Sequence, residues 1–490
     1  MNFIKNKINS IKTLSPTVKS AMVYTFAGLF TRGLSIITVP IFTRLMSTAE
    51  IGTINVYNSW YAMLSVIGTL SLTSGGFMVA MKEYPNKRDE YTSSVLTITT
   101  LMAVIMTIVY ILFPSYWNSF FSLPGDLVVL MLIGLYVGPA RDFWLSKQRY
   151  EVKYKSVAIF TIGSAVLGTG LSVIGVLVAN QMHVGNIDRV RLYSNYVIVY
   201  GAALTIFILL FSKGKTGFNK EYWSFSLKLS IPLIGNSLAG QVLSVSDRTM
   251  ISSMVGKSAV GIYGTLYNVS SLSTIVWSSL NNSFVPYMFS NMETKEGRNK
   301  IKKYVNYILL AYAIVALGLT LLAPEVVRIL ATDEYYAAIY IMPPIAAGIF
   351  LNALGNLYSN ILLYYKKTQC IMIATSVAAA LNVLLNLICI PIYGYQAAAY
   401  TTLVSYVIMA IIESLVVLHV EKKELNGRFS SLYSNKLLFG ICIVLIILCL
   451  MCNLIYESFL LRWGIVLWGA IIAFICRKKI KSLISVIKNR

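Results

Sequence analysis

One arginine of this chain lies inside an apolar stretch that is long enough to cross a membrane. Arg32 falls within residues 21–43. Small or polar residues recur around it at spacings of three and four, which places them on the same helical face: Thr25, Gly28 and Ser35. An ionised side chain at this depth costs several kcal/mol and therefore faces a polar interior. A guanidinium held there can bind a phosphate with two parallel hydrogen bonds, and we favour this anion site over a structural ion pair.

A second polar face is predicted in the seventh apolar stretch. Asn236 and Arg248 belong to a set of polar or small residues that recurs every four positions, and Asp247 lies one position off that face. Asp247 and Arg248 lie towards one end of this helix, so an interfacial pair that reaches the membrane surface explains them equally well. Arg44 occupies the matching end of the first stretch. With Arg32, these arginines would carry positive charge from mid-membrane to the outer surface.

Asparagines form rows at helical spacing in the second half of the chain. Asn352, Asn356 and Asn360 recur every four residues, Asn268 begins a similar row, and Tyr358 lies deep in its span. Amide rows can join membrane helices by hydrogen bonds of about 1 kcal/mol each. The same amides, with Asn236 and a tyrosine ring to stack on, can also bind sugar hydroxyls. The sequence leaves these two interpretations open.

The inventory of catalytic groups is small. The sequence has no nucleophile elbow, metal-ligand spacing or phosphate-binding Gly-Lys-Ser/Thr loop, so we expect no enzyme activity, no metal and no cofactor. Transport by such a chain must draw on a gradient, the membrane potential or consumption of the substrate. Asp247, Asp142 and Glu413 are the acids best placed for coupling to an ion.

The elements that must position these residues are transmembrane helices. The chain of 490 residues is 57% hydrophobic and 12% charged, with apolar stretches along its whole length. Fourteen such stretches are predicted to span: 21–43, 52–80, 92–113, 127–146, 156–178, 193–211, 229–250, 260–285, 304–323, 337–362, 370–390, 396–418, 437–455 and 460–476. The loops between them are too short for a separate soluble domain. We therefore predict an all-α integral membrane protein.

Basic residues are distributed very unequally over the loops. With the N-terminus in the cytoplasm, 33 of the 41 Lys and Arg fall on the inner side and seven on the outer side, and only Arg32 remains inside a span. This asymmetry predicts that both termini are cytoplasmic. It also explains the net charge of +22 without nucleic acid, with attraction to anionic membrane lipids as a further effect.

The spans divide into two groups of six and a final pair. Short similarities between the groups, such as AEIG at 49–52 and AVG at 259–261, suggest a repeat, with the substrate site between its halves. The predicted parts are an amphipathic N-terminus at 1–20, a first lobe at 21–211, a cytoplasmic linker at 212–228, a second lobe at 229–418, a helix pair at 437–476 and a basic tail at 477–490.

Two groups of motifs resemble a known family. The first comprises LFTRGL at 29–34, TRLMS at 43–47 and EIG at 50–52, and the second comprises SIPL at 230–233, SDRTMI at 246–251 and VGIY at 260–263. They resemble the polysaccharide transporter family, whose members include the Wzx-type flippases for O-antigen and capsule repeat units. That family belongs to the superfamily of multidrug, oligosaccharidyl-lipid and polysaccharide exporters. The order of the motifs fits spans 1–12.

The resemblance implies a V-shaped fold of two six-helix lobes around a cationic central cavity. It also implies alternating access, which carries an undecaprenyl-diphosphate-linked oligosaccharide across the bacterial plasma membrane for surface polysaccharide synthesis, with polysaccharide polymerase machinery as a partner. Arg32 matches the first-helix arginine of the family, and Arg248 would assist it at the diphosphate. Related lipid II flippases carry a second arginine six positions later, where this chain has Thr38, which argues against the peptidoglycan precursor.

Two other functions stay open. A multidrug or cation antiporter of the same superfamily would need an acidic site in one lobe, and the spans are poor in acids at mid-membrane. A membrane-embedded polysaccharide polymerase would more often have a large outer loop, and the outer loops here are short.

Overall fold

The protein is built from helices that form two compact units. The computed structural model describes residues 16–73, 76–425 and 430–475, and every regular element in these ranges is a helix. Unit 1 comprises residues up to Thr265 together with Thr368–Thr401, and unit 2 comprises Leu266–Lys367 and the residues after Thr401. The tail predicted at 477–490 and most of the N-terminus predicted at 1–20 lie outside the described residues. The predicted division at 212–228 stays a prediction.

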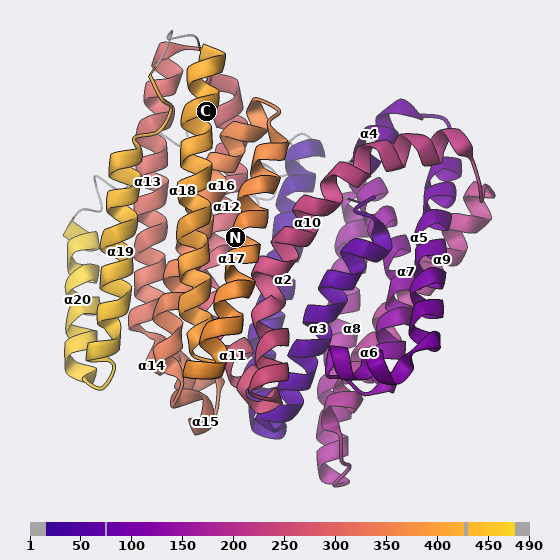
Figure 1. Cartoon of the computed structure of the whole chain (residues 1–490), viewed down its shortest axis with the longest axis horizontal. Coiled ribbons are helices and arrows are strands. Elements are labelled where there is room, and N and C mark those ends of the chain that lie inside the picture. Colours follow the sequence, from indigo (N-terminus) through magenta and orange to yellow (C-terminus); the bar gives the residue numbers. More distant parts are fainter. Residues whose placement is uncertain (1–15, 74–75, 426–429, 476–490) are drawn as a thin grey trace, which may run out of the picture. The chain divides into compact units, whose positions relative to one another are not determined.

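Unit 1 holds most of the helices of the first half of the chain (Figure 1). Its helices are α2 (Pro16–Leu45), α3 (Thr48–Thr69), α4 (Gly76–Glu83), α5 (Arg88–Leu112), α6 (Pro114–Phe121), α7 (Gly125–Tyr150), α8 (Tyr154–Gln181), α9 (Ile187–Gly214), α10 (Lys220–Met254) and α17 (Thr368–Tyr393). Helix α17 comes late in the sequence but packs along α10. Helices α2, α8 and α9 pack together, and α3 packs on α10 and α7.

Unit 2 holds α12 (Ser273–Asn291), α13 (Lys295–Leu321), α14 (Ala323–Leu330), α15 (Asp333–Tyr336), η1 (Ile339–Ile341), α16 (Met342–Tyr364), α19 (Asn435–Ile455) and α20 (Phe459–Ile475). Helices α11 (Lys257–Ser270) and α18 (Ala397–Leu425) begin in unit 1 and continue into unit 2. Helix α16 contacts α12, α13 and α19 and is the most deeply buried of the long helices.

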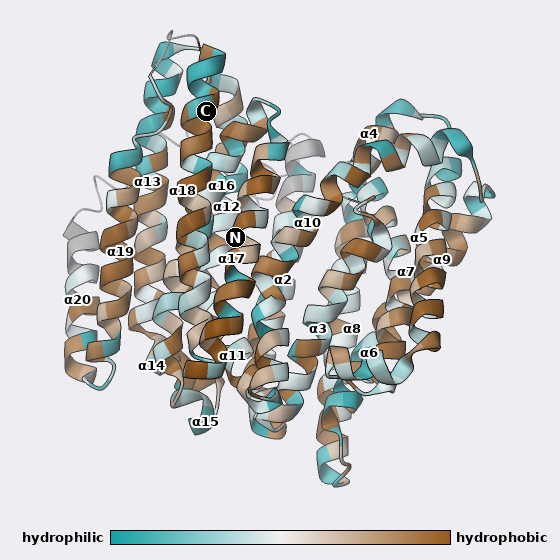
Figure 2. Cartoon of the chain, viewed as in Figure 1, coloured by the Kyte–Doolittle hydropathy of each residue, from teal (hydrophilic) through white to brown (hydrophobic). Residues whose placement is uncertain are grey.

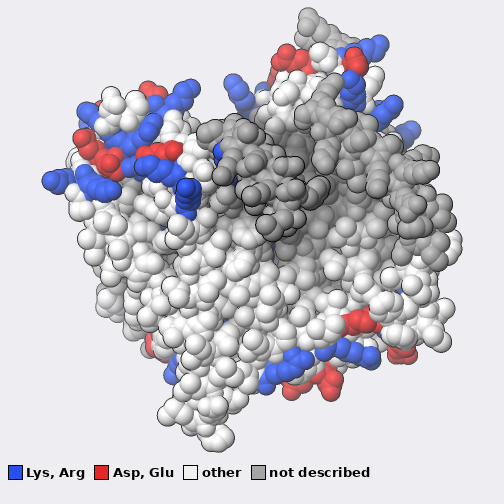
Figure 3. All heavy atoms as spheres, turned by 180° about the vertical axis from the view of Figure 1, so that it is seen from behind, with Lys and Arg blue, Asp and Glu red and all other residues white. Residues whose placement is uncertain are grey.

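Eleven of the described helices are long and apolar enough to cross a membrane. Their outward faces are hydrophobic and their polar residues gather towards the helix ends (Figure 2). The space-filling view agrees, because charged side chains cluster near helix ends and an uncharged band of surface lies between them (Figure 3). The chain is therefore a multi-pass membrane protein, as its composition predicted.

The other three predicted spans are shorter or broken, so the number fourteen stays a prediction. The stretch 52–80 is divided between α3 and α4, because α3 ends at Thr69 and Leu70 and Ser71 adopt left-handed backbone conformations. The stretch 260–285 is divided between α11 and α12. Helix α20, the last of the three, has only 17 residues.

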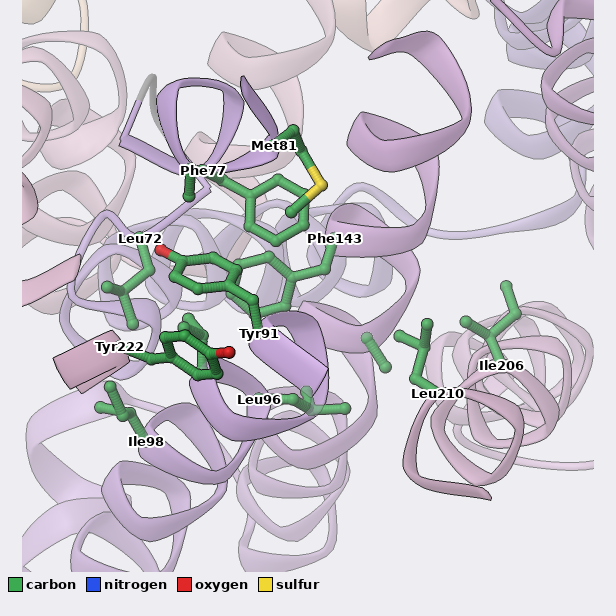
Figure 4. Packing of buried hydrophobic residues seen from close by; sticks show 13 residues of the cluster. Leu72, Phe77, Met81, Tyr91, Leu96, Ile98, Phe143, Ile206, Leu210 and Tyr222 are labelled. Carbon is green, nitrogen blue, oxygen red and sulfur yellow. The ribbon is translucent and has the colours of Figure 1, made fainter. Parts of the chain in front are cut away.

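Aromatic side chains hold α4, α5, α7 and the start of α10 together in unit 1 (Figure 4). Phe77 of α4 packs against Tyr91 of α5 and Phe143 of α7, with ring centroids 6.0 and 4.9 Å apart. The Tyr91 hydroxyl lies 2.5 Å from the Ser226 hydroxyl of α10. This buried contact fixes the first turns of α10, the helix that carries Asp247 and Arg248.

Helices α3 and α11 approach each other closely near their first turns, within unit 1. A Cβ atom added to Gly52 would lie 1.8 Å from the backbone oxygen of Lys257. A Cβ atom added to Gly261 would lie 1.9 Å from the backbone oxygen of Thr48. Each glycine therefore makes room for the backbone of the other helix, and no residue with a side chain fits at either position without movement.

Two ion pairs with buried arginines join elements of unit 2. Arg298 of α13 donates to Glu421 of α18 at 2.6 Å, and Glu421 also accepts from the backbone N–H of Leu432. Arg462 of α20 donates to Glu325 of α14, also at 2.6 Å. These contacts connect the last turns of α18 and the first turn of α20 to helices far from them in sequence.

Candidate functional site

The two arginines predicted on the first span lie on α2 and are both exposed. Arg44 lies in the last turn, where its Nη1 donates to the Pro40 carbonyl at 3.0 Å. A cation at this position also interacts favourably with the helix dipole. Arg32 lies about 15 Å from the start of the apolar segment that begins at Met22, so it is near the middle of the helix. The two arginines thus have different surroundings, and only Arg32 is deep in a span.

Asp247 and Arg248 form a buried group with Tyr263 of α11. The Tyr263 hydroxyl donates to Asp247 Oδ2 at 2.6 Å, and the backbone N–H of Arg248 donates to Asp247 Oδ1 at 2.8 Å. Arg248 Nη1 donates to the Ser244 carbonyl at 3.0 Å and lies 3.9 Å from Asp247 Oδ1. The side chains of Asp247 and Arg248 are 2% and 8% exposed. The structure thus brings two predicted site residues together in the interior of unit 1.

An amide network continues from this group onto α17. The Ser246 hydroxyl lies 3.4 Å from Asn382 Oδ1, which also accepts from Asn386 Nδ2 at 3.2 Å. The Thr401 hydroxyl at the start of α18 donates to Asn386 Oδ1. Both asparagines are fully buried. The spacing of Asn382 and Asn386 signals a shared face, but the sequence did not reveal that this face meets α10.

The remaining amides predicted to bind a glycan have diverse environments. Asn236 is half-buried on α10 and Asn268 is exposed on α11. On α16, Asn356 Nδ2 donates to the backbone oxygen of Asn352 in the preceding turn at 2.7 Å. Asn360 is buried and donates to Asn281 Oδ1 of α12 at 2.9 Å. Among these, Asn360 has the interhelical role that was the alternative interpretation.

Tyr358 is fully buried in unit 2. Its hydroxyl donates to Asn435 Oδ1 at 3.1 Å, and its ring lies 5.9 Å from that of Tyr433 and 6.5 Å from that of Phe439. The Tyr358 ring is therefore packed against Phe439 of α19 and against Tyr433, which lies just before that helix. We do not retain Tyr358 among the residues proposed below for substrate binding.

Glu413 of α18 is buried against α16. The Ser359 hydroxyl donates to Glu413 Oε1 at 2.8 Å. The other carboxyl oxygen, Oε2, is buried and has no hydrogen-bond partner among the described residues. A Cβ atom added to Gly355 would lie 2.8 Å from this oxygen, so the glycine provides the space that the carboxyl group occupies.

Asp142, the third predicted coupling acid, forms an ion pair with its neighbour Arg141 at 2.9 Å. Helix α7 continues to Tyr150, so this pair lies well inside a helix and about 12 Å from its end. A cluster of tyrosines is nearby in unit 1: Tyr57, Tyr61, Tyr196 and Tyr200. Gly134 and Gly138 of α7 make space for the Tyr61 and Tyr200 rings. Sequence analysis did not identify the cluster because it combines α3 and α9.

The chain matches the family model described as polysaccharide biosynthesis protein over residues 17–292. It belongs to this family. The match includes α2 with Arg32 and α10 with Asp247 and Arg248. A second model, MatE, matches residues 232–388 of this family member.

A curated relative of this polysaccharide biosynthesis protein is the probable low-salt glycan biosynthesis flippase Agl15 of Haloferax volcanii. The two are 19% identical over 403 residues, which is 81% of this chain and 82% of the relative.

Two solved structures share the fold. The lipid II flippase MurJ, in an inward closed conformation, has a TM-score of 0.60 at 16% identity and covers 94% of this chain and 100% of its own. An inward-facing multidrug resistance MATE family transporter of the MOP superfamily has a TM-score of 0.60 at 14% identity, with coverages of 79% and 93%. The family member thus has the fold of flippases and multidrug transporters.

Proposed function

We propose that this protein is a flippase for lipid-linked oligosaccharides. Its substrate is an undecaprenyl-diphosphate-linked repeat unit, which it moves across the bacterial plasma membrane by alternating access for surface polysaccharide synthesis. The relatives support this proposal, because the curated one is named as a glycan biosynthesis flippase and one structural neighbour is a lipid II flippase. Polysaccharide polymerase machinery is the expected recipient of the translocated lipid.

The position of Arg32 carries the proposal. Its side chain is permanently charged, lies near the middle of α2 and is exposed in unit 1 rather than buried in a pair. A charge at this depth is retained when it serves a polar pathway. A lipid diphosphate is the anion that a flippase for glycans must move through such a pathway. In this proposal Arg32 binds the diphosphate, and Arg44 lies beyond it on the same helix. Arg248 assists only in a state in which its buried contacts are released.

The test is translocation in liposomes. Purified protein is reconstituted with undecaprenyl-diphosphate oligosaccharide, and arrival in the opposite leaflet is followed for wild type, Arg32→Ala and Arg32→Lys. We expect loss of most of the rate in Arg32→Ala and partial recovery in Arg32→Lys, because lysine keeps the charge but lacks the planar fork. Lys300→Ala, which removes an exposed cation of α13, is the matched control and should keep the wild-type rate.

The antiporter alternative is tested in the same liposomes. The MatE match and the MATE-like fold motivate it. Uptake of a fluorescent organic cation driven by a proton or sodium gradient, without translocation of the glycolipid, would replace the flippase proposal. Translocation of the glycolipid that an excess of the cation does not inhibit would retain it.

Among the three predicted coupling acids, Glu413 is the one we retain for the flippase. Asp142 is paired with Arg141, and both oxygens of Asp247 accept hydrogen bonds. Glu413 has a buried oxygen without a partner among the described residues, and its other oxygen accepts from the Ser359 hydroxyl. Such a carboxyl can take up and release a proton during transport. Glu413→Gln should then fold normally but make translocation insensitive to a proton gradient, and an unchanged gradient dependence would remove Glu413 from the mechanism.

A further inference from the structure

A polar chamber lies inside unit 1 between α2, α3, α8 and α9, all of which are labelled in Figure 1. Its volume is about 170 Å³. The lining has one charged residue, Arg191, and the other polar residues around it are Ser35, Thr38, Asn58, Thr169, Ser172, Asn195 and Tyr196. Among the described residues, no carboxylate is part of this lining. The chamber is smaller than the roughly 300–1,000 Å³ of a site for a drug-sized ligand, so it fits a single charged group or one sugar ring.

Arg191 is held in a defined orientation at the chamber. Its guanidinium lies over the Phe42 ring of α2, 3.6 Å from the ring centroid, and its Nη1 lies 3.8 Å from the Met46 sulfur. The Ser172 hydroxyl of α8 donates to the backbone oxygen of Arg191 at 2.7 Å, which fixes the helix turn that carries it. A guanidinium over an aromatic ring keeps its charge and its planar set of N–H donors, which is the group that oxyanion binding requires.

Two amides complete the polar surface. Asn58 Oδ1 accepts from the Tyr196 hydroxyl at 3.3 Å, which leaves the Asn58 amide group, a donor, on the other side of the side chain. Asn195 lies against Gly168 of α8, where a Cβ atom would be 2.7 Å from Asn195 Oδ1. The hydroxyl groups of Ser35 and Thr38 donate to carbonyls of their own helix, so their oxygens remain as acceptors towards the chamber.

The chamber also has an entrance near the proposed diphosphate residue. Ser35 and Asn58 are exposed, whereas Thr38 and Ser172 are buried, so the first two lie at the mouth and the others at the floor. Arg32 lies three residues before Ser35 on α2, a rise of about 4.5 Å. The mouth of the chamber is therefore adjacent to an anion held by Arg32, and Arg191, over Phe42, lies about 15 Å further along α2.

We propose that this chamber binds an oxyanion of the glycolipid, with Arg191 as its specificity-determining residue. The combination of one guanidinium, amide donors and hydroxyl acceptors fits an acidic sugar or a phosphate, and it disfavours a cation. The proposal rests on the proposed function, because it assigns part of the same substrate. The oxyanion has two sources, the lipid diphosphate itself or an acidic group on the sugar next to it.

Binding to the full-length protein in nanodiscs separates these sources. Calorimetric titrations use inorganic pyrophosphate, methyl glucuronide and, as the neutral reference, methyl glucoside. We expect wild type to bind pyrophosphate or the glucuronide at least about tenfold more tightly than the glucoside, since hydrogen bonds to charged groups contribute about 1.5–3 kcal/mol. If Arg191→Gln loses only glucuronide binding, the chamber binds the acidic sugar. If it loses only pyrophosphate binding, the chamber binds the diphosphate. Loss of both means that either oxyanion occupies the same site.

The matched control is Arg328→Gln. Arg328 of α14 also lies over an aromatic ring, that of Tyr336 at 4.7 Å, but it belongs to unit 2. This variant should keep wild-type binding. Asn58→Ala, at the mouth, changes no buried contact of Arg191 and should weaken the same ligand several-fold, which guards against a folding defect in Arg191→Gln.

Two results would overturn the proposal that the chamber binds an oxyanion. One is that wild type does not prefer pyrophosphate or the glucuronide to the glucoside, and the other is that wild type and Arg191→Gln bind them equally. The proposed function fails separately. A protein that binds an oxyanion through Arg191 but does not translocate the glycolipid is not a flippase for it, although the chamber stands. A protein that translocates acidic and neutral glycolipids equally, with and without Arg191, is a flippase whose selectivity lies elsewhere.

Discussion

The buried ion pair of unit 2 should be far more important for stability than an exposed pair on the same helix. Arg298–Glu421 and Lys300–Glu296 both involve α13 and have nearly equal lengths, 2.6 and 2.7 Å. Their burial differs greatly, because the side chains are 5% and 3% exposed in the first pair and 44% and 79% in the second. Glu421→Gln leaves the Arg298 guanidinium buried without its counter-charge, which costs about 3–5 kcal/mol. Glu296→Gln should cost only about 0.3–0.5 kcal/mol.

The free energy of unfolding can be measured by titrating dodecyl sulfate into dodecyl maltoside micelles and following tryptophan fluorescence. The double variant Arg298→Met/Glu421→Leu should recover much of the loss in Glu421→Gln, because apolar side chains of similar volume avoid the cost of burying a charge. Equal losses for Glu421→Gln and Glu296→Gln would refute the reasoning, since distance rather than burial would then set the energy. A double variant less stable than Glu421→Gln would refute it too, since the charges would then contribute more than their desolvation costs.

The same titration tests three further predictions. Gly261→Ala should lose about 1–3 kcal/mol, because its Cβ atom must displace backbone of α3, whereas Gly201→Ala, with open space around it, should gain about 0.5–1 kcal/mol. Equal stabilities would mean that the close approach is not maintained. Tyr263→Phe should lose about 1.5–3 kcal/mol, because it removes a hydrogen bond to the buried Asp247 carboxylate, and a neutral effect would show that a water replaces the hydroxyl. The free energy of unfolding of Glu413→Gln should lie within about 1 kcal/mol of the wild-type value, because the amide can keep the hydrogen bond that the carboxyl accepts from Ser359. A larger loss would reveal a charge partner of Glu413.

Hydropathy and spacing predicted the helices well because each apolar stretch must satisfy its own backbone hydrogen bonds in lipid. Eleven of the predicted spans correspond to helices long and apolar enough to cross. The breaks after Thr69 and Ser270 were not predicted, since no proline or charged residue lies at either of them. Leu70 adopts a left-handed conformation that is uncommon for a non-glycine residue, and nothing in its side chain signals it.

The candidate site was predicted only in part, for a related reason. Periodicity shows which residues share a helix face, but not which helix that face meets. It grouped Asn352, Asn356 and Asn360 correctly on one helix, yet their partners differ, and Asn360 alone reaches another helix through its side chain in the hydrogen bonds described above. Arg191 is one of the seven basic residues that the charge asymmetry places on the outer side. Its place in the chamber was not predicted, because it depends on how α2 and α8 pack against α9.

The close approach of α3 and α11 has a consequence for the history of this chain. Gly52 meets Lys257 and Gly261 meets Thr48, so the contact maps onto itself when the two helices are exchanged. Identical subunits make self-complementary contacts of this kind when they dimerise. The segments involved, TAEIG at 48–52 and KSAVG at 257–261, both end in a β-branched apolar residue followed by the glycine. This geometry is expected of an ancestor of half the length that paired with its own copy, and whose interface persisted after the two genes fused.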